Sequence, residues 1–303
     1  MSNQDTTSIP TGLALYTLAA ERASSEVIAA YSTSFGLAAK LLGSGIQQHV
    51  ENIYALVRVA DEIVDGAAAD AMAAGGDVLP HLALTELEVE TYRAIKTGFS
   101  TNLVVHAFAH TARTTGFGKE IIEPFFHSMR LDLTEQTYDQ AGFDTYVYGS
   151  AEVVGLMCLQ AFIWHREQQQ GAYSQAEREL LVRGARALGA AFQKVNFLRD
   201  LAADFKALGR SYFPNVRVDN FNESEKQRLV ADISADLAVS AQSLPLLPKE
   251  ARRAVAAAQM LFDALNTRIA STPAEKLIET RIRVANPVKF WILLKALIGV
   301  IPK

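Results

Sequence analysis

The sequence predicts an all-α fold, a single-domain helical bundle around a central cavity. Strand signals are few, because alternating apolar and polar runs are short and Ala and Leu dominate the periodic segments. A length of 303 residues would allow two domains, but no low-complexity linker divides the chain, so we expect one domain spanning residues 1–303. The cavity is inferred from two mostly apolar helical segments that each carry a stripe of acidic side chains.

The N-terminal part begins with a polar stretch that is expected to be flexible over residues 1–12. Residues 1–10 lack the basic and apolar regions of a signal peptide. From Leu13 the pattern becomes helical and runs toward Tyr31–Phe35, where three consecutive hydroxyl residues predict a cap or a turn. A short connection over residues 36–46 then leads to the next helix.

The segment Asn52–Gly66 predicts a helix that is buried on most sides. Arg58, Asp61 and Asp65 lie at i, i+3 and i+7 and share one face, while apolar residues cover most of the rest. Buried carboxylates are rare unless they are paired or bind a metal. One explanation is a simple ion pair between Arg58 and Asp61, and the other is a ligand in a cavity.

The middle of the chain predicts a series of helices. The Ala- and Gly-rich stretch 67–80 is either a loop that moves over the site or a plain surface connection, and the second interpretation is favoured. Helices are expected over residues 82–97, 103–114, 121–138 and 143–164. The last of these contains Gly149 and Gly155, each of which costs about 1 kcal/mol inside a helix. These glycines therefore indicate either close packing or a kink.

A second acidic stripe lies in Gln193–Asp204, after a polar connection. On a helix, Asn196, Asp200 and Asp204 stack at i, i+4 and i+8, and Gln193 joins the same face. Two carboxylates one turn apart repel each other, so we expect solvent, a basic partner or a divalent cation to offset the cost. Apolar side chains occupy the opposite face, which favours a polar cavity wall; a solvated acidic stripe is the alternative.

The C-terminal third predicts a break, a turn and two helices. The acidic helix is expected to end in Gly209–Pro214. A turn bracketed by Pro245 and Pro248 precedes a helix over residues 250–269. The final run, Val288–Ile301, is apolar apart from two lysines and is shorter than the roughly 20 residues that cross a bilayer. It predicts either a helix on a membrane surface, and thus a peripheral membrane contact, or a last helix packed on the bundle.

Composition excludes several classes of function. The net charge of −4 and a pI of about 5.9 give no support for nucleic-acid binding. A single cysteine, Cys158, excludes an internal disulfide framework and fits a reducing compartment, so a cytoplasmic location is expected, with or without attachment to the inner membrane surface. Because Cys158 lies in an apolar run, we expect an inert, buried thiol.

The two acidic pairs, about 140 residues apart in the sequence, predict a metal site if they face each other across the cavity. Oxygen ligands without His or Cys indicate Mg²⁺, or Mn²⁺, rather than Zn²⁺. Mg²⁺ bound by few carboxylates keeps positions for water and phosphate, so a diphosphate substrate is expected. The predicted metal ligands are Asp61, Asp65, Asn196, Asp200 and Asp204.

Four motifs resemble the squalene/phytoene synthase family. They are YSTSF (31–35), DEIVD (61–65), NFLRDLAAD (196–204) and GRSYFP (209–214), in matching order and separation, and the resemblance runs from about Tyr31 to the C-terminus. The form DEIVDG and the C-terminal run TRIRVANPVKFWILLKAL look more like bacterial phytoene synthases than squalene synthases. The resemblance implies the isoprenoid-synthase type of helical bundle.

The resemblance also implies roles for individual residues. Ser32 and Ser34 lie near the diphosphate in this family. Tyr148 aligns with a tyrosine of the pocket, where an aromatic face would stabilise a carbocation, and Asp132 matches an acidic residue near the pocket. The sequence itself leaves two possibilities for Arg210 and Tyr212, which either close over phosphate as a lid or form a surface turn. The residues expected to bind substrate are Ser32, Ser34, Arg58, Gln193, Asn196, Arg199, Arg210 and Tyr212, and those expected in catalysis are Asp61, Asp65, Asp200, Asp204 and Tyr148.

The function implied is a Mg²⁺-dependent prenyl transferase of carotenoid biosynthesis. It would join two geranylgeranyl diphosphates head-to-head, through a cyclopropyl diphosphate intermediate, to phytoene, and no NADPH is expected for this reaction. Two alternatives stay open. One is a squalene or dehydrosqualene synthase that uses farnesyl diphosphate, and the other is a non-catalytic protein that binds prenyl diphosphates or takes part in assembly.

Overall fold

The predicted all-α, single-domain fold is confirmed by a computed structural model, which describes residues 10–302 except 33, 209–211, 215 and 217–220. No β-strand occurs in these ranges. The α-helices are α1 (Gly12–Tyr31), α2 (Ser34–Ala39), α3 (Ser44–Val64), α4 (Ala67–Ala73), α5 (Pro80–Thr97), α6 (Leu103–Thr115), α7 (Lys119–Thr134), α8 (Gln140–Val147), α9 (Val153–Gln170), α10 (Gln175–Leu208), α11 (Glu223–Ser243), α12 (Lys249–Ser271), α13 (Ala274–Leu277) and α14 (Asn286–Leu297). A π-helical turn, η1 (Tyr148–Glu152), joins α8 to α9, and a 3₁₀ turn, η3 (Leu244–Leu246), precedes α12.

Local chemistry explains where several helices begin and end. Asn102 and Asp139 cap α6 and α8, because their side chains accept hydrogen bonds from backbone N–H groups of the first turn. Gly98 and Gly116 follow α5 and α6 with φ angles of 79° and 82°, the left-handed conformation that favours glycine after a helix. Helix α1 already begins at Gly12, within the N-terminal stretch that was expected to be flexible, and residues 1–9 lie outside the described residues.

Two predicted connections contain short helices. The turn expected in Tyr31–Phe35 is present, since α1 ends at Tyr31 and α2 begins at Ser34. However, α2 occupies the first part of the connection expected over residues 36–46. Likewise, α4 forms within the stretch 67–80 that was interpreted as a loop, because its alanines favour a helix.

The two glycines of the central apolar segment are explained by close packing. A Cβ atom on Gly149 would lie 2.2 Å from the carbonyl oxygen of Pro124 in α7, and one on Gly155 would lie 2.6 Å from the carbonyl oxygen of Ala185 in α10. Because neither glycine has a side chain, this segment packs directly against α7 and α10. By length and composition Gln140–Gln170 is able to cross a membrane, but core helices of globular proteins meet the same criterion.

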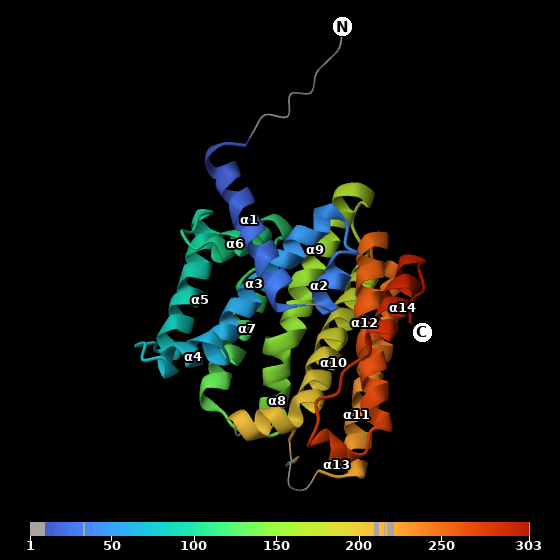
Figure 1. Cartoon of the computed structure of the whole chain (residues 1–303). Helices are drawn as coiled ribbons and strands as arrows, with labels where there is room; N and C mark the ends of the chain where they lie inside the picture. Colours follow the sequence, from blue (N-terminus) through green and yellow to red (C-terminus); the bar gives the residue numbers. More distant parts are fainter. Residues whose placement is uncertain (1–9, 33, 209–211, 215, 217–220, 303) are drawn as a thin grey trace.

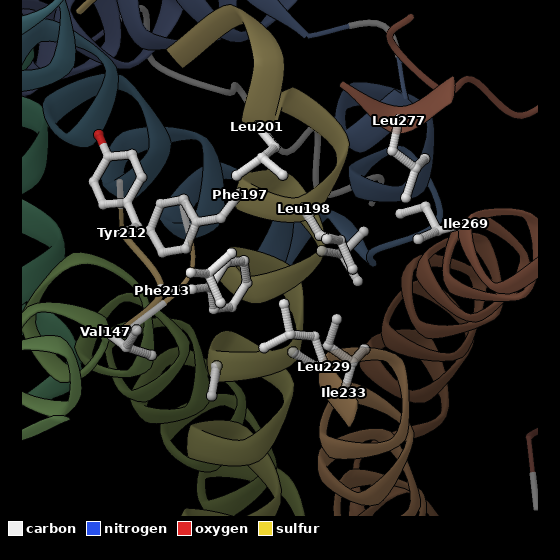
Figure 2. Packing of buried hydrophobic residues seen from close by; sticks show 14 of the residues in the cluster. Val147, Phe197, Leu198, Leu201, Tyr212, Phe213, Leu229, Ile233, Ile269 and Leu277 are labelled. Atoms are coloured by element: carbon white, nitrogen blue, oxygen red, sulfur yellow. The ribbon is translucent and has the colours of Figure 1, made fainter. Parts of the chain in front are cut away.

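The helices are arranged around α3, α9 and α10 (Figure 1). Helices α4, α5 and α6 lie to one side of these, and α11, α12 and α14 lie to the other. The longest helix described, α10, packs against α9, α11 and α12. Figure 2 shows part of its apolar face, where Leu198 and Leu201 belong to one hydrophobic cluster with Leu229 and Ile233 of α11. This packing fixes which face of α10 is left for the interior cavity.

Candidate active site

A cavity of about 880 Å³ lies inside the bundle, and most of its wall is apolar. Side chains of α3, α9, α10, α11 and α12 and of residues 281–289 line it. One part of the wall belongs to a hydrophobic cluster that includes Leu159, Phe162 and Ala254. Another part carries polar side chains, namely Ser32, Tyr54, Asn196, Arg199 and Arg281. Such a wall suits an amphiphilic ligand with a long apolar chain and a charged head.

Arg58 and Glu62 organise the C-terminal end of α3. The Arg58 guanidinium forms an ion pair with Glu62, one helical turn on, and lies 4.4 Å from the centre of the ring of Tyr31 at the cavity. The carboxylate of Asp61 is 3.9 Å from Arg58, at the limit of an ion pair. The simple Arg58–Asp61 pair suggested by the sequence is therefore secondary to the pair with Glu62. The buried Nε–H of Arg58 has no hydrogen-bond partner among the described residues.

The environment of Asp61 disfavours its charged form. Burial raises the pKa of Asp61 from 3.8 to about 7; the nearby Arg58 lowers it, and the carboxylates of Asp65 and Glu62 raise it further. The side chain is 42 % exposed, so the cause is the mass of protein around the carboxyl rather than complete loss of solvent. A cation beside Asp61 and Asp65 would remove this electrostatic cost. Asp65 itself is exposed, directly after the end of α3.

The second acidic motif is paired with arginines. The carboxylate of Asp200 in α10 accepts hydrogen bonds from Arg199 and Arg281, and the Arg281 Nε to Asp200 Oδ1 distance is 2.7 Å. Asn196, one turn earlier, lines the cavity, and Gln193 is half-buried. A basic partner, one of the three possibilities that the sequence left open, is thus present for Asp200. The side chain of Asp204 lies outside the described residues.

Sequence reasoning missed Arg281 and its neighbours. Arg281, Arg283, Asn286 and Lys289 all line the cavity, although they follow α10 by more than 70 positions. They come from the segment between α13 and α14 and from the first turn of α14. The available signal was the run TRIRVANPVK, which combines three cations with no acidic residue. A cationic segment of this kind supplies donors for an anionic ligand.

Other predicted residues lie apart from this wall. Tyr148 is half-buried in η1 under the Arg186 guanidinium, which lies 5.1 Å from the centre of its ring. Asp132 is buried and accepts a hydrogen bond of 2.9 Å from the hydroxyl of Tyr146. Burial, together with Asp132, raises the pKa of Tyr146 well above its usual value. Neither Tyr148 nor Asp132 is among the described residues that line the cavity, so their roles stay predictions.

Tyr212 occupies a core position rather than a lid position in this structure. Its ring is buried and stacks on Phe197, with ring centres 4.0 Å apart and planes at 9° (Figure 2). Any closure over phosphate would have to break this stack. Ser32 lines the cavity as predicted, whereas Arg210 and the side chain of Ser34 lie outside the described residues.

The polar side chains that line the cavity in the described part of the chain are hydroxyls, amides and cations, and Asp61, Asp65 and Asp200 are not among them. The predicted metal ligands are carboxylates and one amide, a donor set that suits a hard divalent cation, and the described lining contributes neither a His nor a thiolate, since burial raises the pKa of Cys158 to about 12. Helices α3 and α10 both contribute to this wall, through Val57 and Asn196 among others. No group of three or more His, Cys, Asp or Glu suited to a metal occurs among the described side chains, which exclude Asp204. Convergence of the four carboxylates remains a prediction.

Comparison with known sequences gives a consistent result. A family model described as squalene/phytoene synthase matches residues 28–287. The chain is 25 % identical over 289 residues to the 15-cis-phytoene synthase of Pantoea ananas, covering 89 % of both chains. It is 30 % identical over 192 residues to the chloroplastic phytoene synthase 3 of Zea mays, covering 62 % of this chain and 41 % of that one.

Solved structures share the fold. A crystal structure of a dehydrosqualene synthase in complex with ligand has a TM-score of 0.74 at 20 % identity and covers 94 % of this chain and 98 % of its own. A squalene synthase from Alicyclobacillus acidocaldarius has a TM-score of 0.69 at 19 % identity, with 86 % and 95 % covered. At these identities the likeness establishes the architecture of the bundle.

Proposed function

The chain belongs to the squalene/phytoene synthase family, whose members are prenyltransferases that act on prenyl diphosphates, and on this premise we propose that it joins two geranylgeranyl diphosphates head-to-head to phytoene. The observation that carries the proposal is an apolar cavity with polar side chains from α3, α10 and the segment 281–289 in its wall. The apolar part would hold the prenyl chains and the polar part the diphosphates.

The proposed site includes Mg²⁺, or Mn²⁺, held by the acidic motifs. The ligands would be Asp61, Asp65, Asn196, Asp200 and Asp204. When bound, the ions neutralise diphosphate charge and so make it a better leaving group. The raised pKa of Asp61 supports this assignment, because a carboxyl that resists ionisation alone gains most from an adjacent cation.

Arginines of this chain would bind the phosphate oxygens. The unpartnered Nε–H of Arg58 supplies one donor near the cavity. Arg199 and Arg281 supply further donors next to Asp200. Because hydrogen bonds between guanidinium groups and phosphate are charge-assisted, they fix the orientation of the diphosphate as well as its affinity.

The apolar wall would protect the cationic stages of the reaction. Loss of diphosphate from one substrate leaves an allylic cation, which forms a carbon–carbon bond to the double bond of the second substrate; loss of a proton closes a cyclopropyl diphosphate. Loss of the second diphosphate, rearrangement and loss of another proton then give phytoene. Water would quench these cations, so its exclusion is essential. The stacked rings of Phe192 and Phe262, with centres 3.7 Å apart, lie in the wall and could stabilise positive charge.

The experiment that tests the proposal is product analysis by mass spectrometry. The purified protein is incubated with geranylgeranyl or farnesyl diphosphate, with and without Mg²⁺ and with and without NADPH. We expect a C40 hydrocarbon from geranylgeranyl diphosphate, dependent on Mg²⁺ and independent of NADPH.

Other outcomes assign other functions. A C30 product from farnesyl diphosphate as the preferred reaction would replace the proposal with squalene or dehydrosqualene synthesis, and a requirement for NADPH would favour the former. Binding of either substrate without any product would indicate a non-catalytic prenyl-diphosphate-binding protein.

A further inference from the structure

A second cavity, of about 720 Å³, lies between α1, α2 and the first turns of α3, and we call it the α1–α3 cavity. Among the described residues, only Ser32 lines both this cavity and the candidate active site. Most of the residues that line the α1–α3 cavity are polar, and Ile28 and Ala29 add an apolar part to its wall. The proposed reaction leaves this space without a role.

One side chain of the lining is a buried carboxylate without an ion pair. Glu51 in α3 is 7 % exposed, and no Lys, Arg or His of the described residues pairs with it. In contrast, Glu88 and Glu152, whose side chains are 16 % and 15 % exposed, each pair with an arginine. A buried charge is costly unless it is paired, so a cation in the α1–α3 cavity would stabilise the Glu51 carboxylate.

Two neighbours hold the Glu51 carboxylate in a fixed orientation. The Ser25 hydroxyl, on α1, donates a hydrogen bond of 2.5 Å to one carboxylate oxygen, and the side-chain amide of Gln47 donates one of 2.7 Å to the other. Each carboxylate oxygen has a second lone pair. The carboxylate is thus oriented by the protein and still able to accept hydrogen bonds from a ligand.

Gln47 and Gln48 present acceptors rather than donors to the cavity. The amide nitrogen of Gln47 donates to Glu51, and that of Gln48 donates to the backbone carbonyl oxygen of Glu21 and to the side-chain oxygen of Asn52, both at 3.0 Å. The side-chain oxygens of the two glutamines accept no hydrogen bond from the described residues, and they are not buried. With Glu51 they provide oxygen acceptors from three side chains, which match the three N–H groups of a primary ammonium ion.

The chemistry of the cavity favours an organic monocation over a metal ion or a polyamine. Ca²⁺ takes about 6–8 oxygen ligands, and Mg²⁺ usually binds carboxylates together with phosphate, whereas the described lining offers one carboxylate. The carbon chain of an ammonium ligand finds an apolar surface at Ile28 and Ala29. Lys40, an exposed residue of the same lining, forms no ion pair with Glu51 and would repel a second positive charge.

We propose that the α1–α3 cavity binds a primary alkylammonium ion, whose N–H groups donate to Glu51, Gln47 and Gln48 and whose carbon chain lies along Ile28 and Ala29. The ligand class is a small monoamine in its protonated form. The inference does not rest on the proposed function, because none of the three acceptor side chains takes part in the proposed reaction.

Isothermal titration calorimetry of the full chain with hexylamine at pH 7, without substrate or metal, tests the proposal. We expect saturable binding with a Kd of about 0.1–10 mM. Hexan-1-ol, which has the same carbon chain without the charge, should bind at least about tenfold more weakly. Diaminohexane should also bind more weakly than hexylamine, and Lys40→Gln should reduce this difference at least about threefold.

A pair of matched variants tests the assigned carboxylate. Glu51→Gln keeps the size of the side chain and removes its charge, so it should weaken hexylamine binding at least about tenfold. Glu26→Gln, at an exposed position in α1, is the control and should leave the Kd unchanged. Circular dichroism verifies that each variant is folded, and the comparison of hexylamine with hexan-1-ol on the wild type needs no variant.

Five results would overturn the proposal. They are no saturable binding of hexylamine, equal affinity for hexylamine and hexan-1-ol, equal affinity of the wild type and Glu51→Gln for hexylamine, tighter binding of diaminohexane than of hexylamine, and displacement of hexylamine by KCl but not by an equal concentration of NaCl. The last result would assign the site to a potassium ion. Because none of these measurements involves turnover, their failure is distinct from failure of the proposed reaction.

Discussion

Glu62 determines where the guanidinium of Arg58 lies. By pairing with Arg58 it holds the guanidinium beside Tyr31 and leaves Asp61 with only a long contact of 3.9 Å. Glu62 is itself fixed by the backbone N–H of Ala67, which donates a hydrogen bond of 2.8 Å. Glu62 thus positions the arginine, and in the proposed site this arrangement would leave Asp61 available to bind a cation.

The pKa of Asp61 predicts a pH dependence of stability in metal-free protein. Its folded pKa is raised from 3.8 to about 7, so its contribution to stability is fully present below pH 3.8 and is lost as the pH rises through 7. Asp61→Asn removes this dependence. Between about pH 5 and about pH 8 in EDTA, we expect the free energy of unfolding to fall by about 1–2 kcal/mol less in Asp61→Asn than in the wild type, a value discounted for solvent screening at this partly exposed side chain.

Urea unfolding of both proteins at the two pH values measures this difference. Mg²⁺ should protect the wild type more at the higher pH, because the ion binds the ionised carboxylate. If the free energy of unfolding changed with pH in the same way in the wild type and in Asp61→Asn, the protein environment would not shift the pKa of Asp61.

Arg281 is predicted to bind substrate. Removing a charge-assisted donor from a diphosphate costs about 1.5–3 kcal/mol, so Arg281→Gln should lower kcat/KM by about ten- to one-hundredfold. Arg268→Gln, at an exposed position in the last turn of α12, is the matched control and should not change kcat/KM. Equal activity of both variants would remove Arg281 from the site.

The sequence allowed the acidic faces to be predicted but not their partners. Asp61, Asp65, Asn196 and Asp200 follow helical periodicity, which is a local property that can be counted. Arg281 reaches Asp200 across 81 residues of sequence, and no local spacing encodes that contact. The ion pair between Arg58 and Asp61 at i, i+3 was one of two explanations that the sequence offered, but the competition from Glu62 at i, i+4 depends on side-chain rotamers.

Among the helices, strongly periodic ones were predicted closely and polar ones were not. The helix predicted over residues 250–269 corresponds to α12 (Lys249–Ser271), whereas α11 was not predicted at all. Helix α11 is rich in Ser, Asp and Glu, which favour caps and turns. Its buried Leu229, Ile233 and Leu237 at i, i+4 and i+8 were the signal that could have revealed it.

The packing of η1 on α7 predicts a large effect of a single methyl group. Gly149→Ala would place Cβ within 2.2 Å of both the Pro124 carbonyl oxygen and the Ser128 Oγ, so α7 and η1 must separate. We expect a loss of about 1–3 kcal/mol in the free energy of unfolding, as for other overpacked interiors.

A matched glycine serves as control for this substitution. In Gly36→Ala the nearest atom to the new Cβ lies at 3.8 Å, which is ordinary contact, so stability should be unchanged or slightly higher. Chemical denaturation of both variants gives the comparison. A neutral Gly149→Ala would mean that the two elements pack less closely than described.

At the scale of the whole molecule, the depth of the cavity would decide which prenyl chain the proposed site accepts. The cavity was predicted from the acidic faces, but its depth follows from how α9, α10 and α12 pack, which no periodicity specifies. The burial of Tyr212 was missed for the same reason, since its stack on Phe197 joins the segment after α10 back to that helix.

Filling the apolar part of the cavity should change the substrate preference. Ala254 in α12 is buried and lines the cavity. In Ala254→Phe, kcat/KM for geranylgeranyl diphosphate should fall at least about tenfold relative to that for farnesyl diphosphate, because the ring occupies space needed by the longer chain. Loss of folded protein would lower kcat/KM for both substrates equally. The ratio of the two kcat/KM values is therefore an internal control. An unchanged ratio of the two kcat/KM values would show that the prenyl chain does not occupy the space beside Ala254.

The central claim is that acidic motifs of α3 and α10 act on one diphosphate site. Its most direct test is the turnover of Asp65→Asn and Asp200→Asn, compared with Asp144→Asn on the exposed side of α8. The account predicts that each of the first two loses at least about 10²–10³ in kcat with unchanged circular dichroism, while the control keeps full activity. Turnover at the wild-type rate in either Asp65→Asn or Asp200→Asn would contradict it.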